Sequence, residues 1–255
     1  MSNQCNIAAG HAISSSSLFH FTDNFDIFKS IVTNGLRFSY ARERFSSEIV
    51  NKIFGENAEG KECLKIPMIS FCDTPITRSN NHAEKYGKYV IGIKKEHLKS
   101  YDGYNLNPVF YMAPDKFNTT LNFLSQLLQE GKKDDVCAML AYIKPISVIM
   151  KDECGNDIEK DFYDEREWRM VFPGKCTINE EQADYTYLQI CNIDFSMISH
   201  IIVEKESEIN DMIKYIIESK TLFGCGDATS TEITIDHKHY LISKITSFER
   251  IEQDY

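Results

Sequence analysis

Glycine and proline are scarce in this chain, which holds 12 and 6 of them among 255 residues. That composition excludes collagen-like, linker-dominated and low-complexity proteins. Long apolar runs are also missing, because no stretch approaches the ~18–20 apolar residues that a membrane-spanning helix needs. The polar N-terminus has neither the basic nor the apolar region of a secretory signal. We therefore expect a cytoplasmic protein with no membrane association.

Positive charge is in deficit as well. Lysine and arginine number 28 against 38 aspartates and glutamates, so the formal net charge is −10. Because affinity for phosphates comes mainly from lysine and arginine, this balance argues against a broad nucleic-acid-binding face. The eight cysteines include no Cys-x-x-Cys pair, and their spacings fit neither a zinc site nor a small disulfide scaffold. We expect reduced thiols and no bound metal.

Hydrophobic residues make up 42% of the chain, enough for a sizeable core. Their spacing changes between strand and helix periods, without an internal repeat or a clear linker. This predicts one α+β domain over residues 1–255, with a poorly structured lead over 1–17. Strands are expected at residues 18–22, 66–72, 89–93, 166–172 and 200–203, with closing strands around 233, 235 and 245. Helices are expected at residues 25–34, in a short stretch ending at 86, at 121–131, from 136 to before 145, and at 209–217.

The run Glu165-Arg166-Glu167-Trp168-Arg169 is the most informative one. On a strand, residues two apart share a face, so Glu165, Glu167 and Arg169 are expected to project together. Two carboxylates and a guanidinium can bind a polyol, and a carboxylate can stabilise the oxocarbenium ion of glycosyl transfer. The alternative is an exposed strand face with an ion network across strands.

Two other runs come at the ends of predicted strands, where binding sites tend to lie. His20-Phe21-Thr22 is either part of a site at a strand-to-helix junction or a structural histidine between aromatic rings. Ser70 and Cys72 share a strand face, but no neighbouring base marks Cys72 as a nucleophile.

Weaker signals have simpler explanations. Arg37, Arg42 and Arg44 alternate with aromatic residues and could hold a phosphate or an unpaired base, but a solvated basic face accounts for them too. His237 and His239 share a face if they lie on a strand, yet no third metal ligand is near them.

In their order along residues 18–172, several short runs resemble the AbiGi-type abortive-infection proteins of bacterial phage defence. The runs are Leu18-Phe-His-Phe-Thr22, Asn34-Gly35-Leu36, Pro67-Met-Ile-Ser-Phe-Cys-Asp-Thr-Pro75, Tyr86-Gly87-Lys88-Tyr89, Asn107-Pro108-Val109 and Tyr163-Asp-Glu-Arg-Glu-Trp-Arg169. The resemblance implies a role in abortive infection, with a cognate toxin or antitoxin as partner.

More distantly, the layout is similar to the ADP-ribosyltransferase superfamily, which includes DarT-like toxins. This implies a pair of facing β-sheets with peripheral helices, NAD⁺ as substrate in a cleft between the sheets, and no metal. The implied catalytic residues are Glu167, Tyr86 and Ser70, and the implied NAD⁺-binding residues are His20, Phe21, Thr22, Arg37, Glu165 and Arg169. Two positions depart from the pattern: Phe21 stands where many relatives have glycine, and the middle motif is Ser-Phe-Cys instead of Ser-Thr-Ser.

The resemblance also implies a role for each residue. His20 would bind the adenosine ribose and the Phe21 backbone the nicotinamide amide, while Ser70 or Tyr86 lines the nicotinamide side. Glu167 would bind the nicotinamide ribose and stabilise the oxocarbenium ion.

Three hypotheses follow from the sequence. The first is a transferase that uses NAD⁺ to modify a protein or nucleic-acid acceptor. The second is a non-enzymatic antitoxin or regulator that binds a partner protein, for which an acidic surface is suited. The third is an RNA-binding protein or nuclease that depends on Arg37, Arg42 and Arg44.

Overall fold

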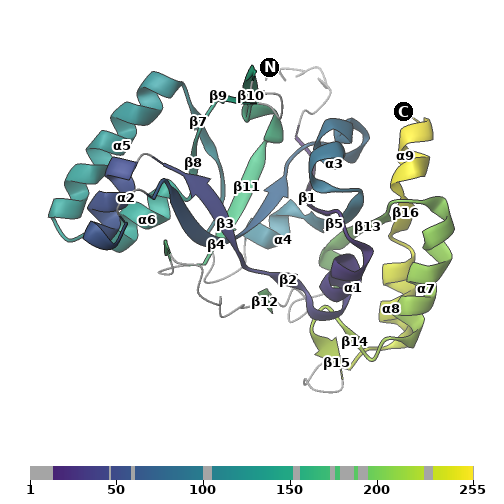
Figure 1. Ribbon diagram of the computed structural model, residues 1–255. Coiled ribbons are helices and arrows are strands. Elements are labelled where there is room, and N and C mark those ends of the chain that lie inside the picture. The colour runs from purple at the N-terminus through teal and green to yellow at the C-terminus, as the bar shows by residue number, and fades with distance from the viewer. Residues whose placement is uncertain are drawn as a thin grey trace, which may run out of the picture.

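The structure is a computed structural model that describes residues 14–45, 47–58, 61–99, 105–151, 156–172, 176–178, 187–188, 195–226 and 232–254. An eight-stranded sheet runs through the molecule in the order β16-β13-β5-β1-β4-β11-β6, with β3 also paired to β4 (Figure 1). Its strands are β1 (Ser17–Thr22), β3 (Ser39–Arg44), β4 (Cys63–Cys72), β5 (Tyr89–Lys94), β6 (Asn105–Pro108), β11 (Glu167–Val171), β13 (Ile198–Val203) and β16 (Ile245–Ser247). All neighbours are antiparallel except β13 and β16, which are parallel.

Shorter strands pair beside this sheet. The pairs are β2 (Leu36–Arg37) with β12 (Tyr187–Leu188), β7 (Phe110–Met112) with β8 (Ile143–Pro145), β9 (Ser147–Lys151) with β10 (Asp157–Asp161), and β14 (Thr221–Leu222) with β15 (Cys225–Gly226). The α-helices are α1 (Phe25–Asn34), α2 (Ser47–Phe54), α3 (Asn80–Tyr86), α4 (Lys95–Lys99), α5 (Pro114–Gln129), α6 (Lys133–Leu140), α7 (Ile209–Glu218), α8 (Ile235–Ile242) and α9 (Phe248–Asp254). The predicted mixed α+β class is confirmed.

Helix α1 illustrates how local sequence sets an element. The Asn24 side chain accepts hydrogen bonds from the backbone N–H groups of Asp26 and Ile27, which caps the first turn. At the other end Gly35 has a φ of 86°, a conformation that glycine adopts without strain and that ends the helix. Between them one face of α1 is buried against the sheet. The helix predicted at 25–34 is therefore confirmed at both ends.

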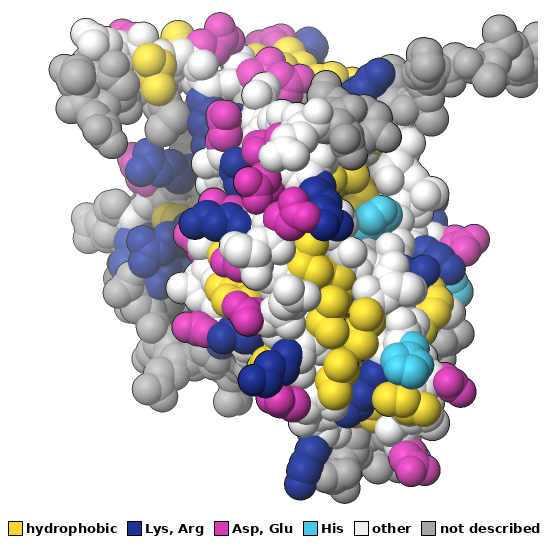
Figure 2. All heavy atoms as spheres, turned by 90° about the vertical axis from the view of Figure 1, so that its right-hand side faces the viewer, with side chains coloured by type: hydrophobic (Ala, Val, Ile, Leu, Met, Phe, Trp, Pro, Cys, Tyr) yellow, Lys and Arg dark blue, Asp and Glu magenta, His cyan; other side chains and the backbone are white. Residues whose placement is uncertain are grey.

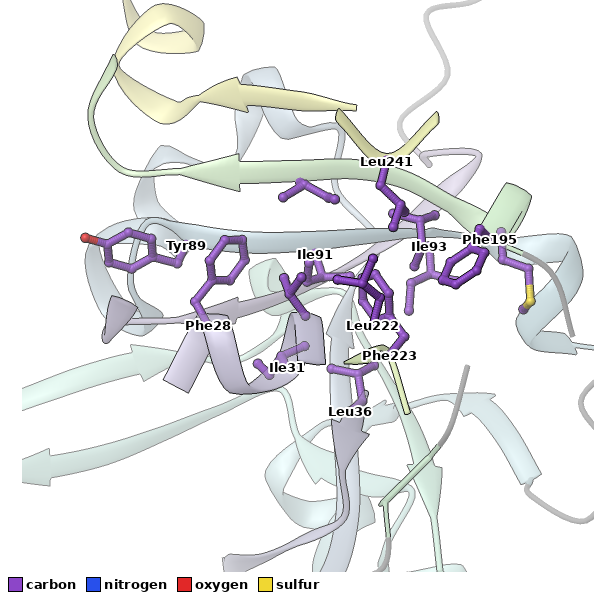
Figure 3. Close-up of a cluster of buried hydrophobic side chains, with 14 of the residues drawn as sticks. Phe28, Ile31, Leu36, Tyr89, Ile91, Ile93, Phe195, Leu222, Phe223 and Leu241 are labelled. Carbon is purple, nitrogen blue, oxygen red and sulfur yellow. The ribbon is translucent and has the colours of Figure 1, made fainter. Parts of the chain in front are cut away.

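The sheet is covered on both faces, by different groups of helices. On one face, α1, α7 and α8 pack on β1, β5 and β13 around a core that Figure 3 shows. On the opposite face, α2, α5 and α6 cover the β3–β4 end. The same face carries α3 and α9 at the β5–β13 end. Figure 1 shows these two helical groups at opposite ends of the molecule, and the candidate functional site lies on the sheet surface between them.

The outer face of the C-terminal part carries a stripe of hydrophobic side chains with charged groups on both sides (Figure 2). Helix α7 buries Met212 and Ile216 beneath this face, whereas Ile217 is half exposed. Among the residues that the structure describes, no helix is long and apolar enough to cross a bilayer.

Outside the candidate site, sequence and structure differ at residues 235–242 and at the N-terminal lead. Residues 235–242 form helix α8 and not a closing strand, because Thr234 caps the helix by accepting from the His237 N–H. On a helix, His237 and His239 no longer share a face. The poorly structured N-terminal segment was expected over 1–17, but residues 14–17 are ordered by contacts: Ser17 begins β1, and the Ser14 hydroxyl donates to Asp73. Residues 1–13 lie outside the described part.

Candidate functional site

The site begins at a gap in the pairing of β4. Strand β11 pairs with β4 from Met68 to Cys72 on one edge. On the other edge, β3 pairs up to Met68 and β1 pairs only at Cys72. None of the described strands pairs with that second edge at residues 69–71, so β1 and β3 separate there. Continuing the β1 register would place Phe21 opposite Ser70, but the pairing stops at Phe19.

The strand register brings side chains from distant parts of the sequence onto one face of the sheet. Cys72 lies opposite both Phe19 of β1 and Glu167 of β11, and Ser70 lies opposite Arg169. Because directly paired residues project to the same face, these side chains share the surface beside the gap. Two clusters of hydrophobic side chains border that surface at its two ends.

A cavity of about 290 Å³ opens at this place; we call it the cleft. Seven of the nine predicted site residues line it: His20, Phe21, Ser70, Tyr86, Glu165, Glu167 and Arg169. They come from β1, β4, α3, a 3₁₀ turn at Tyr163–Glu165 and β11. The remaining two, Thr22 and Arg37, do not line it. Thr22 is nearly buried and pairs with Tyr89, and Arg37 is exposed on β2.

A network of ion pairs forms the floor of the cleft around Arg169, which is 1% exposed. Its Nε donates to Glu167 Oε1 over 2.8 Å, and its Nη2 donates to Glu43 Oε1 over 2.6 Å and to Glu167 Oε2 over 3.0 Å. Its Nη1 donates to the carbonyl of Ala141 over 2.6 Å. Every part of the buried guanidinium therefore meets an acceptor, as a charge removed from water requires.

Lys144 on β8 links the two carboxylates of the Glu165–Glu167 run. Its Nζ lies 2.9 Å from Glu165 Oε2 and 2.8 Å from Glu167 Oε2. Burial by itself raises the pKa of Glu167, but Arg169 and Lys144 outweigh it and hold that pKa at about 2. Glu167 is therefore a carboxylate at neutral pH, fixed in position by two cations.

Glu165 reaches the same network from a turn and not from the strand that the sequence predicts. It ends the 3₁₀ turn, and Arg166, with a φ of 43°, lies between it and β11. The left-handed backbone at Arg166 redirects the chain, yet Glu165 and Glu167 still meet at Lys144. Tyr86 donates its hydroxyl proton to Glu165 Oε1 over 2.7 Å. Burial and the neighbouring Glu165 raise the pKa of Tyr86, so the phenol stays protonated and acts as a donor.

His20 lies beside the unpaired edge of β4. Its Nδ1 is 2.9 Å from the carbonyl oxygen of Ser70. A carbonyl only accepts, so Nδ1 must carry the proton. Burial lowers the pKa of His20 despite the bond to Ser70, which keeps the ring neutral. Nε2 is then an acceptor, suited to a hydroxyl group of a ligand.

Aromatic rings form one wall of the cleft. The His82 ring lies between Phe21, with ring centroids 4.6 Å apart, and Tyr86, with centroids 4.5 Å apart. Burial lowers the pKa of His82 to about 4, although Glu165 and Glu167 oppose the change. The neutral ring and its two neighbours offer a surface on which a planar group can stack.

Cys72 also lines the cleft but lacks the features of a nucleophile. The side chain is 1% exposed, and burial raises the pKa of its thiol. Among the described residues no group of three or more His, Cys, Asp or Glu side chains is arranged to hold a metal ion. Arg37, Arg42 and Arg44 are all exposed, which fits a solvated basic face and a phosphate-binding face equally.

Three residues that line the cleft were not predicted from the sequence: Glu43, His82 and Lys144. The alternation of a strand could have indicated Glu43, because in Ser39–Arg44 it turns this side chain inward between the exposed Arg42 and Arg44. Lys144 and His82 lie in short elements far from Glu167 in sequence, so only the tertiary fold brings them near it.

The comparisons with known proteins identify a family but no close relative. No curated protein and no solved structure matches this chain. One family model does match, over residues 47–217, about two thirds of the chain; its description is "Putative abortive phage resistance protein AbiGi, antitoxin". The matched span contains β4, α3, β8 and β11, which supply Ser70, Tyr86, Lys144 and Glu167 to the cleft, and it excludes β1 with His20. This chain belongs to the AbiGi family of abortive phage resistance proteins.

Proposed function

We propose that this chain binds NAD⁺ in the cleft and transfers ADP-ribose to a macromolecular acceptor during phage defence. The observation that carries the proposal is the convergence of His20, Ser70, Tyr86 and Glu167 on one cavity. The gap on β4 also supports the proposal. At this gap β1 and β3 separate along β4, as strands that belong to two facing sheets would.

The dimensions and chemistry of the cleft suit the nicotinamide half of NAD⁺. A cavity of about 290 Å³ lies at the lower end of the range for ligand pockets and has room for a ring and a ribose. The rings of Phe21, His82 and Tyr86 provide a stacking wall. Three carboxylates, Glu43, Glu165 and Glu167, face two cations, Lys144 and Arg169, which leaves an excess negative charge to attract the cationic nicotinamide ring.

Glu167 supplies the main chemical contribution in this proposal. Its carboxylate accepts a hydrogen bond from a ribose hydroxyl and stabilises the positive charge that develops on the ribose ring. The bond between C1′ and the nicotinamide nitrogen breaks, and both electrons leave with neutral nicotinamide. The acceptor nucleophile then bonds to C1′ and loses its proton to water. Arg169 and Lys144 keep Glu167 ionised and oriented throughout.

Thermal unfolding with and without NAD⁺ tests the binding step. At 100 times Kd the ligand adds about 2.7 kcal/mol to the unfolding free energy, which raises Tm by a few degrees for a chain of this size. We expect Glu167→Gln and His20→Ala to lose the shift and Glu159→Gln, on the exposed β10 strand, to retain it. Release of nicotinamide by the wild type, lost in Glu167→Gln, tests the chemistry. Wild-type protein whose Tm does not respond to NAD⁺ would contradict the proposal.

A second candidate function is non-enzymatic binding of a toxin, which the family description favours. The observation behind it is a set of hydrophobic side chains that stay exposed on β7, β9, β10 and the turns that follow β8 and β10, which we call the hairpin patch: Phe110, Ile146, Ile149, Ile158 and Tyr163. Ile149 on β9 is 76% exposed, and Phe110 on β7 is 66% exposed. Large apolar side chains left exposed in neighbouring segments of a protein can mark a surface that a partner covers.

Substitutions in the hairpin patch distinguish the two candidate functions. If the chain acts by binding a toxin, Phe110→Ser with Ile149→Ser abolishes co-purification of a toxin expressed beside it, whereas Glu167→Gln does not. If it acts as a transferase, Glu167→Gln abolishes NAD⁺ turnover, whereas Phe110→Ser with Ile149→Ser leaves it unchanged. Toxin capture that survives these substitutions would show that the hairpin patch is not the interface, and failure of the wild type to capture the toxin would remove the second candidate.

A further inference from the structure

A second cavity lies at the opposite end of β1 from the Phe21 side of the cleft. Its volume is about 590 Å³, and it is formed where β1 and β13 begin and β5 ends. The described residues of the lining are three serines, three lysines, one histidine and one carboxylate: Ser16, Ser17, Ser199, Lys94, Lys95, Lys99, His200 and Glu96. We call this cavity the basic pocket. Nothing in the proposed NAD⁺ chemistry uses it.

The backbone of β13 and a glycine of β5 shape the basic pocket. The pairing of β13 with β5 shifts register between Ile198 and His200, so Ser199 occupies a bulge. Both Ser199 and His200 thereby come to lie over Gly92: a Cβ built on Gly92 would be 2.9 Å from Ser199 Oγ and 3.0 Å from His200 Cβ. Those distances leave no space for a larger residue, and bulges of this kind often redirect side chains at binding sites.

The charges of the basic pocket are not balanced in the way that those of the cleft are. Of its three lysines, Lys95 is bound to Asp73, with 2.6 Å between Nζ and Oδ1. Within the described part of the chain, Lys94 and Lys99 have no carboxylate partner, and Lys99 instead lies over the Trp168 ring. Glu96 is the single carboxylate among the described residues of the lining, so the three lysines leave this cavity with an excess of positive charge.

We propose that the basic pocket binds a phosphorylated ligand of nucleotide size. Two ammonium groups supply the charge that a phosphate dianion needs, and the Ser16 hydroxyl supplies a neutral donor. The Ser199 hydroxyl lies 3.0 Å from His200 Nδ1, and it can donate to the phosphate when that nitrogen carries a proton and donates to Ser199. The volume exceeds what a phosphate ion fills and lies within the range for small-molecule pockets. The phosphate lies between Lys94 and Lys99, and the remainder of the ligand occupies the space beside them.

Trp168 provides a direct readout, because it is the single tryptophan of the chain and both Lys95 and Lys99 lie over its ring, at 5.2 and 5.3 Å. We would titrate inorganic pyrophosphate, ADP and a short single-stranded oligonucleotide at constant ionic strength, following Trp168 fluorescence and the heat of binding together. ADP and pyrophosphate should bind saturably, and the oligonucleotide no more tightly than pyrophosphate. The double variant Lys94→Met with Lys99→Met should weaken both by at least tenfold.

The matched control is Lys116→Met with Lys132→Met, which removes the same charge from exposed lysines outside the basic pocket. It should bind pyrophosphate and ADP as the wild type does. An equal loss in both double variants would show non-specific attraction and overturn the proposal, as would the absence of binding heat in the wild type. Tighter binding of the oligonucleotide would assign the site to a nucleic acid instead. Since pyrophosphate has neither nicotinamide nor ribose, these results stand apart from those on NAD⁺ in the cleft.

Discussion

The cleft and the basic pocket differ in how their charges are compensated. In the cleft, Arg169 and Lys144 are held between carboxylates at 2.6 to 2.9 Å. In the basic pocket, Lys94 and Lys99 face the cavity without a carboxylate partner in the described part of the chain. Charges buried by folding must be paired by the protein itself, whereas charges open to solvent can remain available to a ligand. Under the two proposals, the cleft charges serve both folding and binding, whereas those of the basic pocket serve binding alone.

The largest expected effect comes from breaking the cleft network at Arg169. Replacement by methionine leaves Glu43 and Glu167 buried without their main partner, which costs about 3–5 kcal/mol of unfolding free energy. Urea unfolding measures this loss. Arg44→Met, on the exposed side of β3, should change stability by about 0.5 kcal/mol or less. Similar losses of unfolding free energy in the two variants would show that the buried network stabilises the protein no more than an exposed arginine does.

Acid should destabilise the protein in two pH windows, both set by the cleft. Burial lowers the pKa of His82 to about 4 from 6.5, so the unfolded state binds more protons between these values and stability falls as pH falls through them. The stability from Glu167, whose pKa is lowered from 4.5 to about 2 because its cations outweigh burial, is present above pH 4.5 and is lost toward pH 2. Each group contributes at most about 1.4 kcal/mol per pH unit.

His82→Gln and Glu167→Gln separate these windows. Urea unfolding from pH 7 to pH 3 should show that His82→Gln flattens the upper window alone. The stability difference between wild type and Glu167→Gln should be greatest at pH 7 and shrink below about pH 4.5. A His82→Gln profile parallel to that of the wild type would remove His82 as the origin of the upper window.

The smallest effect is expected in the basic pocket. Lys94→Met with Lys99→Met should leave the unfolding free energy within about 0.5 kcal/mol of the wild type, because neither lysine forms an ion pair within the part of the chain that the structure describes. Urea unfolding without ligand measures this, and the same double variant must still lose pyrophosphate binding. A loss approaching that of Arg169→Met would mean that these lysines are structural, and the contrast between the two cavities would disappear.

Much of the secondary structure was predictable because its signals are local. The Asn24 cap and Gly35 stop of α1, the apolar stripe of α7 and the apolar run of β13 each depend on residues within one element. The prediction failed at 235–242, where isoleucine spacing suggested a strand. There the Thr234 cap and the packing of α8 against α7 and the sheet favour a helix, and intrinsic strand propensity is too weak to resist such packing.

For the site, the sequence by itself determined which residue types stand at the strand ends: His20, Ser70, Glu167 and Arg169 were all recognisable from their runs. Only the tertiary structure decided that β1 and β3 separate on β4, and that Lys144 lies between Glu165 and Glu167. The physical reason is the separation along the sequence between the residues that interact. Caps and periodic faces depend on neighbours within one element, whereas a buried charge selects its partner through strand register and the packing of distant segments, which no local pattern records.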